Sequence, residues 1–237
     1  MTAGHVIGEL NLASDKEKSV ILARFFKTGP GEYGEGDRFL GVTVPKQRII
    51  AKKYRDLPLG EVEKLLISSW HEHRLTGLLI LTYRFPESEL AQKREIFDFY
   101  LSHTTHINNW DLVDATAPGI VGAYLVESGL DISLLRHLAR SSSLWERRIA
   151  IVSTFAWIRK GRQQECFEIA EILLHDHQDL IQKATGWMLR EVGKRCDEKV
   201  LRDFLDRHAS GMPRTMLRYA IERFPESVRQ KYLRKKE

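Results

Sequence analysis

The sequence predicts an all-α protein built as a curved, superhelical stack of antiparallel helix pairs. Nearly every segment of the 237-residue chain repeats its apolar residues with the helical period, and no stretch alternates with the period of two that marks a strand. Short connections separate the segments, so neighbouring helices should pack antiparallel. The expected helices are 15–27, 45–54, 59–69, 72–85, 87–102, 110–127, 131–140, 144–160, 163–175, 178–195, 197–208 and 213–235.

The helix pairs recur at intervals of about 35–45 residues, a spacing typical of HEAT-like repeats, which stack into a long concave surface. An irregular helical bundle is the alternative. We expect one domain over residues 1–237, interrupted by the glycine-rich segment 28–38, TGPGEYGEGDR, which is a poor helix former. Because this segment lacks the Lys-Ser/Thr ending of a phosphate-binding P-loop, we interpret it as a flexible loop over a groove entrance.

Composition excludes several classes of protein. The apolar stretches are too short and too interrupted to cross a bilayer, and the first fifteen residues show no secretory signal. Cys166 and Cys196 are the only cysteines, which favours a reducing compartment and neither a disulfide scaffold nor a zinc site. We therefore expect a cytoplasmic monomer, associated with the nucleoid if the source is bacterial, without membrane contact.

Positive charge is concentrated in the second half of the chain. From residue 141 onward there are 20 Lys and Arg against 14 Asp and Glu, whereas the preceding residues hold 17 against 18. This imbalance suits a polyanionic partner, which binds by releasing counterions. A well-solvated surface is the alternative on charge alone.

The helix expected at 110–127 presents an indole and a carboxylate to the same space. Trp110 and Asp114 lie four residues apart, off the buried stripe. Pro118 cannot donate to the carbonyl of Asp114, so the helix should kink beside that carboxylate. The alternative is a core tryptophan with an ordinary surface aspartate. The residues expected in the buried stripe are Val113, Ala117, Ile120, Val121 and Tyr124.

The helix expected at 178–195 combines a large aromatic with cations. Trp187 lies in a row with Lys183, Arg190 and Lys194, which suits a stacked sugar or base with its phosphates held nearby. Gly186 should let another backbone approach closely. The alternative is a half-buried tryptophan flanked by cations. The expected buried stripe consists of Ile181, Ala184, Thr185, Met188 and Val192.

Two further observations concern phosphate and metal binding. Arg148 in the helix 144–160 can be turned toward the groove, where a guanidinium suits bidentate phosphate contact, although a plain surface charge is the default interpretation. The histidine pairs lack a third ligand and the usual zinc spacing, so we expect neither a metal nor a cofactor. These pairs are His71 and His73, His103 and His106, and His175 and His177.

Five stretches, in order along the chain, together resemble the AlkD-type DNA alkylation-repair family. They cover most of the sequence, from about Ala23 to Phe224. Each stretch is weakly specific by itself, but the ordered set is fairly specific. The stretches are FLGVTVPKQR (39–48), WDLVD (110–114) followed by Pro118, WERR (145–148), IQKATGWMLR (181–190) and MPRTMLRYAIE (212–222).

The resemblance implies HEAT-like repeats that cradle duplex DNA containing alkylated purines. It implies a monofunctional DNA glycosylase for base excision repair, which removes cationic N3- or N7-alkylated purines. Asp114 would be the catalytic carboxylate, Trp110 and Trp187 would flank the deoxyribose, and Arg148 would bind phosphate.

Two positions and one segment depart from a close relative. Phe25 occupies the position at which the relative has Tyr. Ala156 occupies the position of a Lys in the relative, and Arg159 or Lys160 would substitute for that Lys. The glycine-rich loop is an extra segment. A non-catalytic DNA-structure-binding protein on the same scaffold is the alternative. A protein-interaction scaffold is disfavoured by the basic row beside Trp187.

Overall fold

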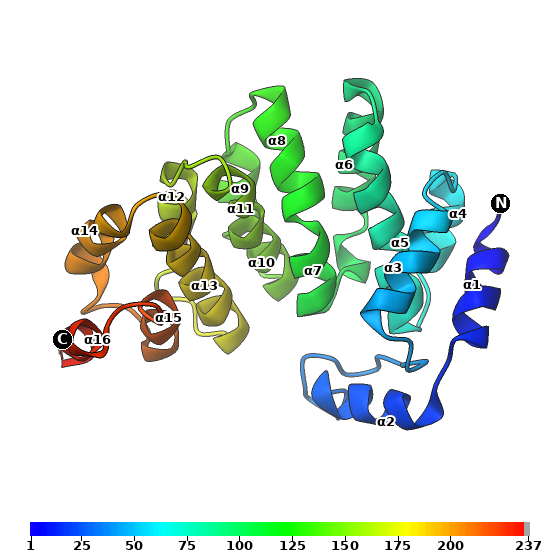
Figure 1. Ribbon diagram of the computed structural model, residues 1–237, viewed down its shortest axis with the longest axis horizontal. Helices are drawn as coiled ribbons and strands as arrows, with labels where there is room; N and C mark the ends of the chain where they lie inside the picture. The colour runs from blue at the N-terminus through cyan, green and yellow to red at the C-terminus, as the bar shows by residue number, and fades with distance from the viewer. Residues whose placement is uncertain (235–237) are drawn as a thin grey trace. The chain divides into compact units, whose positions relative to one another are not determined.

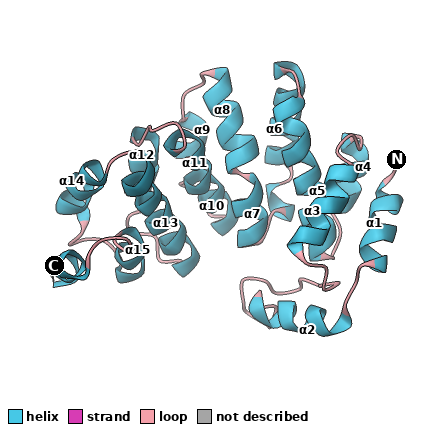
Figure 2. Ribbon diagram, viewed as in Figure 1, coloured by secondary structure: helices cyan, strands magenta, loops and turns pink. Residues whose placement is uncertain are grey.

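The computed structural model describes residues 1–234 and shows an all-helical chain over that range (Figures 1 and 2), which confirms the predicted fold class. One isolated bridge, between Arg38 and Trp70, is the β pairing found among the described residues. The chain divides into two compact units, Met1–Thr116 and Ala117–Glu237. The single domain over 1–237 therefore stays a prediction. No helix in the described part of the chain is long and apolar enough to cross a membrane.

Helix α5 (His71–Arg84) is the centre of the first unit. Every residue from His71 to Leu81 is buried, because α3 (Val44–Lys53), α4 (Leu59–Leu66) and α7 (Trp110–Thr116) all pack against this helix. Helix α1 (Ala3–Leu12) packs against α3 and α4. The unit also contains α2 (Lys16–Phe25), α6 (Leu90–Ser102) and two short 3-10 turns, Phe85–Glu87 and Thr104–His106.

Helix α13 (Asp179–Arg195) is the centre of the second unit. The helices α10 (Leu144–Ser153), α12 (Gln164–Ile172), α14 (Glu198–His208) and α15 (Arg214–Ala220) pack against it, and α9 (Ser133–Leu138) packs against α10 and α12. Such helix pairs in two layers are consistent with HEAT-like repeats. The unit also contains α8 (Ala123–Ser128), α11 (Phe155–Ile158) and α16 (Glu226–Arg234).

Both predicted stripes are buried. Every member of the stripe from Val113 to Tyr124 and of the stripe from Ile181 to Val192 is at most 5% exposed. The close approach expected at Gly186 is also confirmed, because a Cβ there would lie 2.4 Å from the carbonyl oxygen of Met216 and 2.6 Å from Cβ of Tyr219. Any side chain at position 186 would therefore push α15 away from α13.

Three of the larger differences from the predicted helices have a local explanation or signal. Helix α1 was not predicted, although Ala3, Val6 and Leu10 are spaced at helical intervals and are buried. The helix expected at 144–160 breaks at Thr154, whose hydroxyl donates to the carbonyl of Ile151 and competes with the backbone ladder. The helix expected at 213–235 breaks before Pro225, because the residue before a proline avoids helical geometry. Residue 235 lies outside the described residues.

The helix irregularity expected at Pro118 takes the form of a π-helical turn. This turn, Pro118–Gly122, follows α7 and precedes α8, and the amide of Gly122 donates to the carbonyl of Ala117 over 3.0 Å. Its bonds therefore span five residues instead of four, a feature frequent at functional sites. The predicted irregularity is therefore confirmed as a wider helical turn, and the kink itself stays a prediction.

The glycine-rich segment forms turns that fold back on the end of α2. The amide of Gly34 donates to the carbonyl of Lys27 over 3.1 Å. A Cβ at Gly34 would lie 2.3 Å from the carbonyl oxygen of Phe26, so a larger residue could not approach α2 in this way. The loop is therefore held against the helix that bears Phe25.

Candidate functional site

Helix α7 bears the predicted indole and carboxylate. It begins at Trp110, and the side-chain oxygen of the buried Asn109 just before it accepts the Trp110 amide over 2.8 Å. Leu112, Val113 and Thr116 are buried, whereas Trp110 and Asp114 are both partly exposed. The indole and the carboxylate therefore lie off the buried face, and they are one helical turn apart, as the spacing predicts.

An aromatic cluster surrounds Trp110 within the first unit. It consists of Phe25, Phe26, Phe39 and Trp110. The ring of Phe26 stacks between those of Trp110 and Phe39, with centroids 5.2 and 5.1 Å away. Phe25 meets Trp110 edge to face at 5.9 Å and remains 61% exposed. An exposed phenyl ring beside an indole offers an apolar surface to a ligand.

Helix α2 supports Phe25 without burying any of its own residues. An apolar pocket of about 400 Å³ lies beneath it, and Asp15 caps its first turn by accepting the amide of Lys18. The pocket leaves α2 fewer packing contacts than a core helix has. The lining residues that the sequence did not single out include Ile21, Leu22 and Leu75.

Tyr33 brings the glycine-rich loop to the tryptophan. Its hydroxyl oxygen accepts a hydrogen bond from the Trp110 indole N–H over 3.2 Å. The same hydroxyl donates to the carbonyl of Phe25 at the longer distance of 3.5 Å. Sequence reasoning missed Tyr33 because a loop residue has no periodicity that would point it at a helix 77 residues away.

A buried charge network ties this loop to α5 and α7. Asp37 accepts from His71 Nδ1 over 2.9 Å and from Asn109 Nδ2 over 3.3 Å, and it forms an ion pair with Arg74. His71 Nε2 donates to Asp111 over 2.8 Å. The side chains of His71, Arg74 and Asp37 are 2%, 6% and 5% exposed, so these charges are held away from water.

Opposing effects set the ionisation of this network. Burial alone would lower the pKa of His71, but Asp111 and Asp37 outweigh it and raise the pKa to about 9. Burial would raise the pKa of Asp37, but His71 and Arg74 outweigh it and hold that pKa below its usual range. At neutral pH the network therefore contains a histidinium between two carboxylates. His71 was set aside with the histidine pairs because they lack a third metal ligand, and its actual partners, 34 and 40 residues away, could not be read from local spacing.

The raised pKa of His71 predicts a loss of stability in alkaline solution. A histidine whose pKa is higher in the folded protein contributes stability that is fully present below about 6.5 and is lost as the pH rises through about 9. We expect the free energy of unfolding to fall by about 3 kcal/mol across this range. Urea titrations from pH 6.5 to 9.5 measure it, and His71→Gln should remove the pH dependence. A flat wild-type profile would contradict the assignment.

Tyr100 lies near the candidate carboxylate and is itself buried. Its hydroxyl is 3.1 Å from the hydroxyl of Thr116. Burial raises the pKa of the phenol, and the negative charge of Asp114 raises it further. The phenol therefore stays neutral beside Asp114 and adds no second negative charge.

Trp187 and its neighbouring cations lie on α13 in the second unit. Trp187 is partly exposed, and its ring centroid is 6.2 Å from that of Phe155. Lys183 pairs with Asp179 over 2.6 Å and Arg190 with Glu222, whereas Lys194 is exposed. The predicted row is thus interleaved with carboxylates, a pattern that the spacing of its cations did not reveal.

Arg148 is buried, which excludes the interpretation of a plain surface charge. The residue is 5% exposed, and its Nη1 donates to the carbonyl of Leu180 over 2.6 Å. The guanidinium therefore ties α10 to the first turn of α13. Its contact with phosphate stays a prediction.

The predicted residues fall into the two units. Phe25, Trp110 and Asp114 belong to the first unit, and Arg148 and Trp187 belong to the second, so their convergence on one face stays a prediction. Arg159 and Lys160 are exposed at the end of α11. The guanidinium carbon of Arg159 lies 4.5 Å from the centroid of Phe155.

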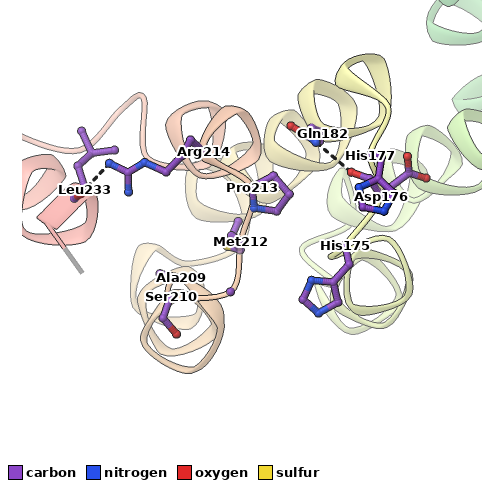
Figure 3. A pocket seen from close by; sticks show the side chains of 11 residues that line it. His175, Asp176, His177, Gln182, Ala209, Ser210, Met212, Pro213, Arg214 and Leu233 are labelled. Atoms are coloured by element: carbon purple, nitrogen blue, oxygen red, sulfur yellow. Dashed lines mark hydrogen bonds between the residues drawn. The ribbon is translucent and has the colours of Figure 1, made fainter. Parts of the chain in front are cut away.

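One pocket of the second unit contains none of these residues. It has a volume of about 780 Å³ and is lined by the segment 175–177, Gln182 and the segment 209–214 (Figure 3). Gln182 donates to the carbonyl of Asp176, and Arg214 donates to the carbonyl of Leu233. No group of three His, Cys, Asp or Glu residues within positions 1–234 is arranged to hold a metal ion.

Comparison with known proteins assigns a family. The family model for "DNA alkylation repair enzyme" matches residues 6–224. A solved structure described as a predicted DNA alkylation repair enzyme from Enterococcus faecalis is similar with a TM-score of 0.71, covering 90% of this chain and 97% of that one. At 15% identity, that likeness shows the fold alone. No curated protein matches the chain. Because the family model spans most of the sequence, the chain belongs to the DNA alkylation repair enzyme family.

Proposed function

We propose that this protein is a monofunctional DNA glycosylase, which hydrolyses the N-glycosidic bond of N3- or N7-alkylated purines in duplex DNA. Family membership supports a role in DNA repair. The observation that carries the finer proposal is α7, where Trp110 and Asp114 lie one turn apart off the buried face, with the exposed ring of Phe25 beside the indole. An aromatic wall with an adjacent carboxylate suits a sugar that gains positive charge.

Alkylation at N3 or N7 makes the purine cationic and therefore a good leaving group. The electron pair of the glycosidic bond moves to N9 of the purine, which leaves as a neutral base, so no general acid is required. The deoxyribose acquires oxocarbenium character, and the carboxylate of Asp114 supplies the opposite charge near C1′. A water molecule orientated by Asp114 attacks C1′, and its proton passes to the carboxylate and then to solvent.

The tryptophans and cations have separate roles in this proposal. Trp110 and Trp187 exclude bulk water and turn electron-rich faces toward the sugar. Because Arg148 has little exposed surface, its main role is structural, and it holds α10 against α13. Lys183 and Arg190 exchange a carboxylate for a phosphate when DNA binds. The proposed phosphate ligands are Arg148, Arg159, Lys160, Lys183, Arg190 and Lys194, with Phe25 contacting the strand.

Base release from methylated duplex DNA tests the proposal. The protein should release 7-methylguanine or 3-methyladenine, measured by chromatography of the soluble fraction. It should leave abasic sites that break only after alkali, because no lysine is assigned to Schiff-base chemistry. Duplex binding without release of either base would favour the non-catalytic DNA-binding alternative, and negligible affinity for DNA would reject both.

A further inference from the structure

Two arginines of the second unit converge on one phenyl ring. The guanidinium carbons of Arg159 and Arg195 lie 4.5 and 5.0 Å from the ring centroid of Phe155. Arg159 follows α11 and Arg195 is the last residue of α13, so the approach of these two helices creates the pair. Sequence reasoning singled out Arg159 but neither Arg195 nor Phe155.

The carboxylates around this pair do not balance its charge. Arg195 donates from Nε to Glu191 over 2.8 Å, and Glu191 also lies 3.9 Å from Arg190. Arg159 has no carboxylate within ion-pair distance among residues 1–234. Two cations that share one aromatic ring lie within about one Debye length, ~10 Å at 0.1 M salt, and repel each other. Consistent with this, desolvation of the guanidinium against its neighbours and the charge of Arg195 lower the pKa of Arg159.

The ring holds the two guanidinium groups in place without neutralising them. Phe155 is itself 9% exposed, so it is a fixed platform, and a cation over an aromatic face gains modest stabilisation. Each planar guanidinium keeps N–H donors for a second partner. An anion within reach of both groups would relieve their repulsion and accept hydrogen bonds from each. The cluster therefore suits an anion with several oxygens.

We infer that Arg159, Arg195 and Phe155 form a binding site for one phosphodiester group of the DNA backbone. The choice of DNA as the source of the phosphate rests on the proposed function. Phe155 also contacts Trp187, whose indole is proposed to flank the deoxyribose, and in a DNA strand each sugar is covalently joined to its neighbouring phosphates. The site therefore fixes a phosphate close to the sugar that Trp187 contacts.

Salt-dependent binding to an unmodified duplex tests this inference. Neutralising one phosphate contributes about 0.9 to the slope of log Kobs against log salt concentration. The variant with Arg159→Gln and Arg195→Gln should lose about 0.9 of that slope and about tenfold in affinity at 0.1 M salt. Because both arginines contact one phosphate, the two single substitutions should show non-additive losses. Arg159→Lys should retain part of the affinity, since it keeps the charge but not the guanidinium geometry.

Arg202 provides a matched control. Its guanidinium also lies over a phenyl ring, 4.6 Å from the centroid of Phe224, but it is paired with Glu198. Arg202→Gln should leave the slope and affinity unchanged. A wild-type slope in the double variant, or an equal loss in the Arg202 variant, would overturn the inference. Because the assay uses unmodified DNA, it tests the phosphate site independently of base release. A protein that releases no base can still show the expected loss of slope, and a wild-type slope in the double variant would leave the glycosylase proposal intact.

Discussion

Replacing Asp114 by asparagine is expected to lower the rate of base release by about 10²–10³-fold, the effect of removing one preorganised electrostatic group at a site of developing charge. Asparagine has almost the same shape, but it cannot oppose the positive charge of the sugar or accept the proton of the attacking water. Affinity for DNA should stay close to that of the wild type, because a carboxylate does not attract phosphates. Single-turnover release from methylated duplex DNA measures the rate, and fluorescence anisotropy measures the affinity.

Asp98→Asn is the appropriate control for a general loss of negative charge. Asp98 lies on α6, is 52% exposed and pairs with Arg94 over 2.6 Å. This variant should release bases at the wild-type rate. If both variants release bases at the wild-type rate, Asp114 is not the catalytic carboxylate. A parallel loss of thermal stability in Asp114→Asn would identify a structural effect in place of a catalytic one.

Asp37→Asn is expected to have the largest effect on stability, lowering the free energy of unfolding by about 3–5 kcal/mol. The substitution leaves Arg74 buried without its carboxylate and leaves His71 with Asp111 alone. Nε of Arg74 has no hydrogen-bond partner in the structure, so this guanidinium has little compensation for losing Asp37. Urea unfolding monitored by circular dichroism at pH 7 measures the change.

Asp56→Asn is the matched control for this substitution. Asp56 is 73% exposed and lies 3.8 Å from Arg55, so its removal should change stability by less than about 1 kcal/mol. Equal effects of the two substitutions would show that the Asp37 network adds nothing beyond an exposed ion pair. The loop should also loosen in Asp37→Asn, because Tyr33 and Asp37 belong to the same segment. Altered Trp110 fluorescence would report the lost contact with Tyr33.

Periodicity predicted most of the helices, though not α1, and it predicted the side of α7 that bears the candidate site. The buried stripe through Val113 follows from side chains three and four residues apart, and the same spacing placed Trp110 and Asp114 together. Local rules also located the irregularity at Pro118, although they did not specify its π-helical form. The break before Pro225 was missed because apolar spacing continued across the proline.

Contacts between distant segments could not be predicted from the sequence. The Tyr33–Trp110 hydrogen bond, the partners of His71 and the convergence of Arg195 on Phe155 each depend on how separate helices pack. Arg148 illustrates the same limit, because its burial depends on α13 and not on its own helix. Charge spacing along α13 likewise did not reveal that Glu222 pairs with Arg190.

The attachment of the glycine-rich loop has a consequence for how such a segment is gained or transplanted. Its anchoring aspartate is encoded within the loop, but the two side chains that neutralise it, His71 and Arg74, belong to a central helix. Grafting residues 28–38 alone onto a related scaffold would introduce Asp37 without the two side chains that neutralise its charge. A transferable unit is therefore discontinuous in sequence, because segment 28–38 must be moved together with His71 and Arg74.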